Sequence, residues 1–192
     1  MFTLAQGLYN QFTVKPEYNV IVVGLDNAGK STFVEHAKNI CVVNNHAKKD
    51  LTKITPTVGL NLGKIDRYEL ILNLWDLGGQ SGLRSLWQNY LSECHAIVFV
   101  IDANDIARFD EVKEAFDSLT KSRDLSSIPV LVIFNKHEIC DIASAEDLKK
   151  SFQAADLEDM AVFYTSAVDG TNVERCIIWL EQTLRGREPF QS

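Results

Sequence analysis

The segment Gly24–Ser31 constrains the fold of this chain more than any other stretch. It reads Gly-Leu-Asp-Asn-Ala-Gly-Lys-Ser and matches the phosphate-binding pattern G-x-x-x-x-G-K-[ST], after the apolar run Val20–Val23 and before residues that can form a helix. The glycines let backbone N–H groups point inward at a helix N-terminus, where the dipole favours anions. Lys30 can then reach the outer phosphates, and the Ser31 hydroxyl can ligate Mg²⁺. The alternative, an ordinary glycine turn, would require a chance match over the whole segment.

Length and charge limit the classes of function. A chain of 192 residues can form one α/β domain with a full core and is too short for two ordinary domains with linkers. The net charge of −7 argues against nucleic acid as a partner and against broad adhesion to anionic lipid. The four cysteines form no C-x-x-C pair, which favours free thiols in a reducing compartment over a zinc site. Without a secretory signal or a membrane-spanning apolar run, we expect the protein on the cytosolic side.

Strand-like and helical segments alternate along the chain. Apolar, β-rich runs predict strands over residues 18–23, 58–68, 69–75, 96–101, 130–134 and 160–165. Apolar spacing and end signals predict helices over 31–38, around 109–119, from Ser144, and after a possible capping box, Thr171-x-x-Glu174. The polar stretch 44–50 predicts a mobile loop. This alternation predicts an α/β fold with a mostly parallel sheet flanked by helices, and with ligand loops at the carboxyl ends of its strands.

Residues 1–12 predict an amphipathic helix. At 100° per residue one face gathers Met1, Phe2, Leu4, Ala5, Leu8, Tyr9 and Phe12, and the opposite face carries no Lys or Arg. Such a face would bind a membrane only reversibly, and it could instead pack on its own domain. We therefore divide the chain into an N-terminal helix and linker (1–17), one domain (18–185) and a polar tail (186–192).

A second motif, Asp76-Leu77-Gly78-Gly79-Gln80, lies at the end of a predicted strand. Asp76 can hold a Mg²⁺-bound water, and Gly79 can bring a backbone N–H against a γ-phosphate. Gln80 is then placed to orient an attacking water. Alone, the segment could be a glycine turn, but its pairing with a phosphate loop favours the functional interpretation.

Two further loops follow predicted strands, Asn135-Lys136-His137-Glu138 and Ser166-Ala167. Amide and carboxylate acceptors in the first and a backbone N–H in the second could form a pocket for a base. Each loop is a weak signal by itself, because Asn, Lys and Ser are common in loops. Their order behind the phosphate loop gives them weight.

Together with Pro56-Thr57-Val58-Gly59, these segments resemble the five nucleotide motifs of small GTPases, in the same order. Within them, Gly24–Lys30 and Trp75–Gln80 resemble the Arf and Arf-like branch. Three other segments resemble its Arf-related subfamily of the trans-Golgi: Met1–Leu4, Lys53–Thr55 and Tyr90-x-x-x-Cys94-His95. The resemblance implies a P-loop NTPase G domain with a six-stranded sheet and an N-terminal amphipathic helix, which binds GTP or GDP with Mg²⁺.

The resemblance also assigns roles to residues. It implies that the γ-phosphate is sensed by Gly79, that the attacking water is positioned by Gln80, and that Mg²⁺ is ligated by Ser31 and Thr57 in the GTP state, with Asp76 supporting the ion. By the same resemblance, the nucleotide phosphates would be contacted by Asp26, Asn27, Ala28, Gly29, Lys30, Ser31 and Thr32. The guanine would be contacted by Asn135, Lys136, Glu138, Ser166 and Ala167. An apolar effector patch would be formed by Leu60, Trp75 and Tyr90.

Three departures from the Arf pattern are visible. Glu138 stands where the family usually has Asp; it keeps the acceptors for guanine N1–H and the 2-amino group, so guanine should still be preferred over adenine. The segment Asn39–Leu51 is longer than in typical Arf proteins. Position 2 is Phe, which excludes N-myristoylation and resembles the acetylated start of the Arf-related subfamily, implying a protein receptor at the Golgi.

The resemblance implies a switch that hydrolyses GTP slowly and acts in vesicle trafficking, cycling between cytoplasm and the cytosolic face of Golgi membranes. Its implied partners are an exchange factor, a GTPase-activating protein, effectors and the receptor. We see no arginine in an obvious position to act in cis, so one supplied in trans is expected. A P-loop nucleotide kinase would need an arginine-rich lid, which we do not find. A nucleotide-binding scaffold with negligible hydrolysis stays an alternative.

Overall fold

The computed structural model describes residues 15–41, 48–121, 125, 128–139, 152, 157 and 159–189. The predicted N-terminal amphipathic helix, most of the predicted mobile loop and the predicted helix start at Ser144 lie outside the described residues. Among the described residues, no helix combines the length and apolarity needed to cross a bilayer.

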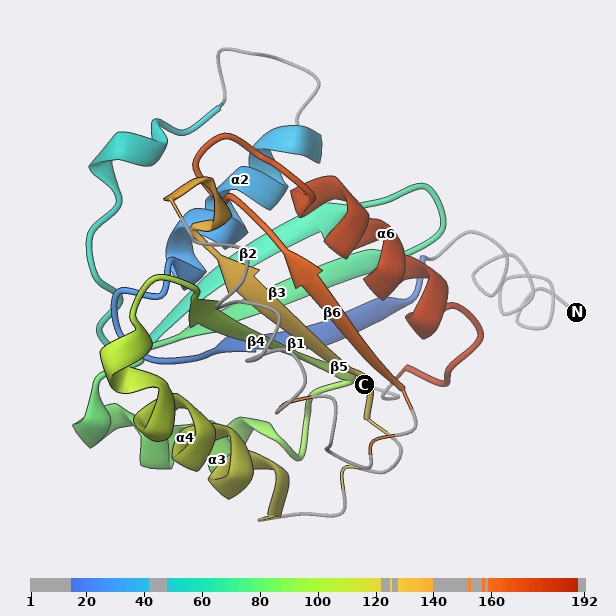
Figure 1. The fold of residues 1–192 in the computed structure, drawn as a ribbon. Helices are drawn as coiled ribbons and strands as arrows, with labels where there is room; N and C mark the ends of the chain where they lie inside the picture. The colour runs from blue at the N-terminus through green and yellow to red at the C-terminus, as the bar shows by residue number, and fades with distance from the viewer. Residues whose placement is uncertain are drawn as a thin grey trace, which may run out of the picture.

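A six-stranded sheet forms the centre of the molecule, in the order β2-β3-β1-β4-β5-β6 (Figure 1). Only β2 runs antiparallel to its neighbour; the other pairs are parallel. The predicted α/β class and mostly parallel six-stranded sheet are therefore confirmed. The strands are β1 (Glu17–Val23), β2 (Leu60–Asp66), β3 (Ile71–Leu77), β4 (Ala96–Asp102), β5 (Val130–Asn135) and β6 (Met160–Tyr164).

Helices cover both faces of this sheet (Figure 1). On one face lie α2 (Lys30–Cys41) and α6 (Val173–Leu184), and on the other α3 (Trp87–Tyr90) and α4 (Phe109–Lys121). Alternate residues of β1 serve the two cores: Val20 and Val22 pack toward α2, whereas Ile21 and Val23 pack toward α4. Short 3-10 helices occupy the loops: η2 (Leu51–Lys53), η3 (Ser81–Leu86), η4 (Ile106–Arg108) and η5 (His137–Ile139).

Two local predictions were wrong in detail. The second and third strands were expected at 58–68 and 69–75, but they span Leu60–Asp66 and Ile71–Leu77. The first ends and the second begins where they do because the reversal occupies Arg67–Leu70, where the Arg67 N–H donates to the Leu70 carbonyl at 2.9 Å. The capping box at Thr171 does not form. The N-cap of α6 is Asn172, whose φ is 58° and whose amide donates to the Tyr164 carbonyl, while the Thr171 hydroxyl bonds Asp169 at 2.6 Å.

The β2–β3 hairpin is tied down at its tip by ionic contacts. Lys15 Nζ lies 2.5 Å from Asp66 Oδ1 and donates to the Arg67 carbonyl at 2.8 Å. Arg67 Nε donates to Glu181 on α6 at 3.1 Å, and the Arg67 guanidinium also reaches Cys41 Sγ at 3.9 Å. The open end of the hairpin lies at the other side of the sheet, beside the Gly24–Ser31 loop.

Candidate functional site

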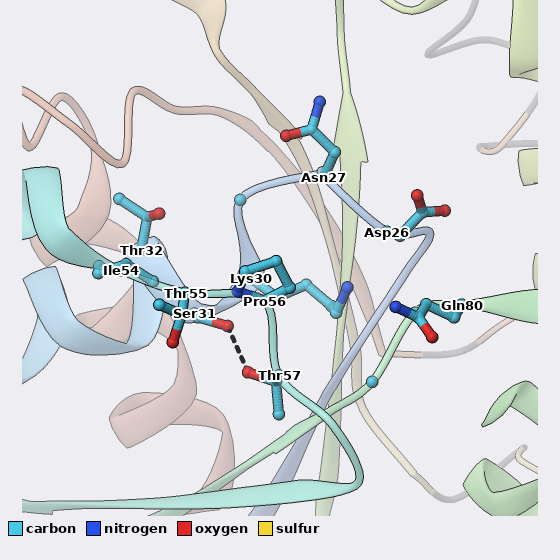
Figure 2. Close-up of a pocket in the computed structure, with 13 residues that line it drawn as sticks. Asp26, Asn27, Lys30, Ser31, Thr32, Ile54, Thr55, Pro56, Thr57 and Gln80 are labelled. Atoms are coloured by element: carbon cyan, nitrogen blue, oxygen red, sulfur yellow. Dashed lines mark hydrogen bonds between the residues drawn. The ribbon is translucent and has the colours of Figure 1, made fainter.

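The Gly24–Ser31 loop joins β1 to α2 and lines a cavity of about 240 Å³ (Figure 2). Its backbone needs glycine at two points. A Cβ on Gly24 would lie 2.1 Å from the Val100 carbonyl oxygen, and one on Gly29 would lie 2.3 Å from Asn135 Nδ2, with both residues at positive φ. The cavity is lined by Asp26, Asn27, Gly29, Lys30, Ser31, Thr32, Ile54, Thr55, Pro56, Thr57, Gly78, Gly79 and Gln80.

Three oxygen atoms meet at the floor of this cavity. Ser31 Oγ donates to Asp76 Oδ2 at 2.6 Å, Thr57 Oγ1 donates to the same oxygen at 2.8 Å, and the two hydroxyls lie 2.8 Å apart. Figure 2 shows Ser31 and Thr57 facing one another across the pocket. Asp76 Oδ1 is buried and has no hydrogen-bond partner among the described residues. Two hydroxyls and a carboxylate with one unpartnered buried oxygen are oxygen ligands of the kind that Mg²⁺ prefers, so the residues present fit this ion.

Ionisation of the buried Asp76 carboxylate is unfavourable when no cation is bound beside it. Burial raises its pKa, against the hydrogen bonds from Ser31 and Thr57, which lower it. Because the folded-state pKa lies above the unfolded value, the stability of the nucleotide-free protein falls as pH rises through that interval. A bound cation would compensate the charge.

Asp76→Asn is therefore expected to raise the Tm of the nucleotide-free protein at pH 7 by about 2–5 °C. The same change should weaken Mg²⁺-dependent nucleotide retention by about 10- to 100-fold, since Asn cannot compensate the ion's charge. Thermal unfolding in EDTA and nucleotide release with and without Mg²⁺ measure the two effects. A fall in both Tm and retention would mean that Asp76 is a structural acceptor only.

Lys30 crosses the cavity as a buried ammonium (Figure 2). Its Nζ donates to the Leu25 carbonyl at 2.7 Å. Burial lowers its pKa to about 8, although the nearby carboxylates of Asp76 and Asp26 act in the opposite direction. The phosphates of a nucleotide would supply the missing negative charge and raise this pKa again.

Affinity for GDP is expected to fall about fourfold between pH 7 and pH 8.5, because free Lys30 loses its proton over this range and must regain it on binding. Titration with a fluorescent GDP analogue at several pH values measures the slope. Lys30→Arg is the control, since arginine stays protonated throughout. An equal slope in wild type and Lys30→Arg would contradict the assignment.

The Gly78–Gln80 segment packs directly against the phosphate loop. The Gly78 N–H donates to the Gly59 carbonyl at 2.9 Å, and the Trp87 indole donates to the Gly78 carbonyl at 3.1 Å. A Cβ on Gly79 would meet the Gly24 carbonyl oxygen at 2.4 Å. The exposed Gln80 lines the cavity and makes no side-chain cap to η3. The structure thus brings Thr57, Gly79 and Gln80 to one cavity.

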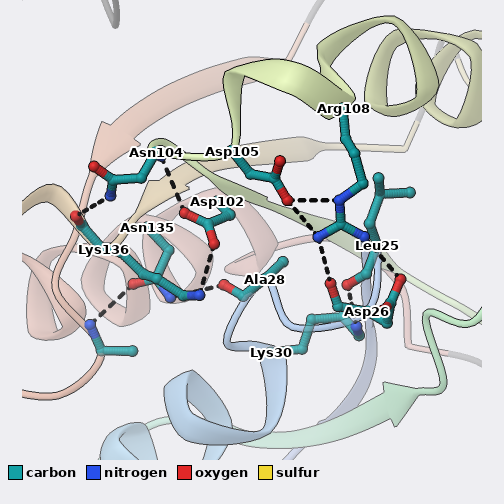
Figure 3. Close-up of polar contacts among 11 residues, drawn as sticks. Leu25, Asp26, Ala28, Lys30, Asp102, Asn104, Asp105, Arg108, Asn135 and Lys136 are labelled. Atoms are coloured by element: carbon teal, nitrogen blue, oxygen red, sulfur yellow. Dashed lines mark hydrogen bonds and ion pairs between the residues drawn. The ribbon is translucent and has the colours of Figure 1, made fainter. Parts of the chain in front are cut away.

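Asn135 and Lys136 are held by several parts of the fold (Figure 3). The buried Asn135 amide donates to the Ala28 carbonyl at 2.8 Å, and its oxygen accepts from the Ala167 N–H at 2.9 Å. Asn135 therefore joins three of the predicted motifs, a structural role that its sequence position did not indicate. Lys136, at φ 62°, pairs with Asp102 at 2.6 Å.

The remaining base-pocket candidates lie beside this network. Ser166 and Ala167 are buried, and the Ser166 hydroxyl accepts from the Asp169 N–H at 3.3 Å. Glu138 lies in η5 and is exposed. The two loops meet where the His137 N–H donates to the Thr165 carbonyl at 3.0 Å, so the base-pocket candidates of both loops lie close together.

The predicted apolar patch gathers on one surface. Trp75 and Tyr90 meet edge to face with ring centroids 5.6 Å apart. Leu60 stands two residues from Leu62, the cross-strand neighbour of Trp75, so all three share a face of the hairpin. Leu62 is 61% exposed and belongs to this surface, although it was not among the predicted residues.

Two arginines near the cavity were not singled out from the sequence. Arg84 Nε donates to the Gly79 carbonyl at 3.0 Å, and its guanidinium pairs with Glu111 on α4 at 2.6 Å. Arg108 reaches the phosphate loop at Asp26. Both follow strand ends at the ligand edge of the sheet, and this position is the one sequence signal that could have drawn attention to them.

Comparison with known proteins identifies similar chains. Residues 4–184 match the ADP-ribosylation factor family. ADP-ribosylation factor-related protein 1 of Rattus norvegicus is 41% identical over 184 residues, covering 94% of this chain and 91% of the relative; the Homo sapiens protein gives the same figures. ADP-ribosylation factor-like protein 3 of Saccharomyces cerevisiae is 37% identical, with 99% of each chain covered. The Arl6 BBS3 small GTPase of Trypanosoma brucei, solved with GppNp, is 26% identical with a TM-score of 0.72, covering 90% of this chain and 99% of that one.

Proposed function

We propose, from the premise that this chain belongs to the ADP-ribosylation factor family and is a GTP-binding switch, that its GTP form is recruited to Golgi membranes. There it controls vesicle trafficking and recruits effectors. Arf-family small GTPases bind GTP and GDP and generally hydrolyse GTP. The slow GTP hydrolysis proposed for this chain returns it to the cytoplasm.

The main support is that the segment before β2 and the segment after β3, which form the open end of the hairpin, both reach the phosphate site. Thr57 precedes β2 and its hydroxyl contacts Ser31 and Asp76, while Gly79 follows β3 and packs on the phosphate loop. A γ-phosphate that favours both contacts would therefore fix the hairpin's position. The hairpin carries Leu60, Leu62 and Trp75, so its position would change the surface offered to effectors.

For hydrolysis, Ser31 and Thr57 would hold Mg²⁺ with support from Asp76, and the ion would neutralise charge on the β- and γ-phosphates. Gln80 orients the attacking water. The guanidinium groups of Arg84 and Arg108 are both occupied by protein acceptors. Intrinsic hydrolysis is therefore slow, and a GTPase-activating protein that supplies an arginine would accelerate it by ~10³–10⁵.

Guanine is the base that this site would select. Glu138 offers carboxylate acceptors for guanine N1–H and the 2-amino group, and adenine has no donors at those positions. The nucleotide carried by the purified protein should be extracted and identified, and GDP or GTP is expected. ATP binding as tight as GDP binding would contradict the assignment, and Glu138→Asp measures how the longer side chain alters guanine affinity.

The N-terminal residues 1–12 would provide the membrane contact. In this proposal an acetylated Met1 and a Golgi receptor hold the GTP form at the membrane through reversible peripheral contact. GTP-driven ordering of Thr57 and Gly79 would shift the hairpin and release this helix from the domain. Recruitment to Golgi membranes should then be much stronger for GppNp-loaded than for GDP-loaded protein. Equal recruitment of the two forms would contradict the proposal.

A further inference from the structure

Arg108 contacts the phosphate loop from a distant part of the sequence (Figure 3). It ends the short helix η4, immediately before α4. Its Nη1 lies 3.0 Å from Asp26 Oδ1, and its Nη2 donates to the Asp26 backbone carbonyl at 3.3 Å. Its Nε donates to Asp105 Oδ2 at 2.5 Å, which holds the guanidinium in place. Arg108 thus contacts both the carboxylate and the backbone carbonyl of Asp26.

The first consequence is electrostatic. Asp26 places a negative charge on a loop that has to hold phosphates, and its side chain is half exposed. Without a compensating cation, this carboxylate would repel a triphosphate more than a diphosphate, because the triphosphate adds further negative charge at the outer end of the site. Lys30 is buried on the inner side of the loop and is directed at the Leu25 carbonyl. Arg108 supplies positive charge to Asp26 from η4, where the same guanidinium also pairs with Asp105.

The second consequence concerns the peptide bond between Asp26 and Asn27. The described backbone contains no cis peptide, so the carbonyl and the N–H of this planar unit point in opposite directions. Arg108 holds the Asp26 carbonyl outward, toward η4. The Asn27 N–H is therefore directed to the opposite side, into the loop, and Asn27 itself has the φ of 60° that such anion-binding loops use.

We propose that Arg108 is a positioning residue for the nucleoside triphosphate: it compensates the charge of Asp26 and fixes the Asn27 N–H as a phosphate donor. This inference rests on the proposed function, since it assumes that the loop holds GTP. The Arg108 side chain has two effects that an experiment can separate. The charge effect should favour the triphosphate selectively, whereas the peptide orientation should help both nucleotides.

The test compares fluorescent GppNp and GDP analogues on wild type, Arg108→Ala and Arg108→Ala/Asp26→Asn. Arg108→Ala is expected to weaken GppNp binding about tenfold and GDP binding about threefold. The double variant should bring the ratio of the two affinities back to the wild-type value, because it removes the uncompensated charge. Lys121→Ala, which removes an exposed positive charge at the far end of α4, is the control and should leave the ratio unchanged.

An Arg108→Ala ratio within about twofold of wild type, or an altered ratio that Asp26→Asn does not restore, would overturn the inference. Partial misfolding cannot imitate the expected result, because an inactive fraction lowers apparent binding of both nucleotides equally. Wild-type protein that binds neither analogue would instead refute the proposed function, so the two failures are distinguishable.

Discussion

Gly79→Ala is expected to retain GDP but to bind GppNp about 10- to 100-fold more weakly than the wild type. The added Cβ would lie 2.4 Å from both the Gly24 carbonyl oxygen and the Leu25 carbonyl carbon, and 2.5 Å from the Asp26 nitrogen. These are backbone atoms of the phosphate loop, so no side-chain rotation can relieve the overlap. The end of β3 would have to withdraw from the loop, and its contact with a γ-phosphate would be lost.

Gly82→Ala provides a matched control in the same region. A Cβ on Gly82 meets nothing within 4 Å, so this variant should bind both nucleotides like the wild type. Parallel titrations of GDP and GppNp, with Trp fluorescence as an independent readout, measure the difference. If Gly79→Ala bound GppNp as tightly as Gly82→Ala does, the close approach of Gly79 would have no part in nucleotide sensing.

Gln80→Leu is expected to lower single-turnover GTP hydrolysis by about 10²-fold or more while leaving GDP affinity within about twofold. Gln80 lines the cavity and is exposed, and its backbone carbonyl, not its amide, caps the first turn of η3 by accepting from the Leu83 N–H at 2.8 Å. Leucine therefore removes the water-orienting amide without removing a structural hydrogen bond.

The exposed Gln88 on α3 offers a comparison, because Gln88→Leu makes the same chemical change outside the nucleotide cavity. Its hydrolysis rate should equal that of the wild type. Equal rates for Gln80→Leu and the wild type, with and without candidate activating proteins, would instead favour a nucleotide-binding scaffold that hydrolyses little.

The elements that carry strong local patterns could be predicted from the sequence. Val20–Val23 and the following glycine loop predict β1, the phosphate loop and α2, and the continuous apolar runs predict β4 and β5 within one or two residues. The family resemblance drawn from the motifs is confirmed by the comparisons. These features could be predicted because a continuous apolar run or a fixed glycine requirement is visible in consecutive residues.

The features that escaped prediction depend on partners far away in the chain. Arg108 meets Asp26 across 82 positions, and Asn135 meets Ala28 across 107. Neither contact leaves a local pattern. The Thr171 capping box failed for a local reason, because the Thr171 hydroxyl donates to Asp169, two residues earlier, at 2.6 Å.

The alternation of side chains along β3 limits how the hairpin can move. Leu72 and Leu74 face the core, and every residue of β3 from Ile71 to Asp76 is paired with one of β1. A slip of one residue would turn these leucines outward, whereas a slip of two would restore the same faces. Any shift of β3 along β1 that kept Leu72 and Leu74 in the core would therefore have to cover two residues, or about 6.6 Å. A smaller shift would lose either the strand pairing or the burial of these leucines.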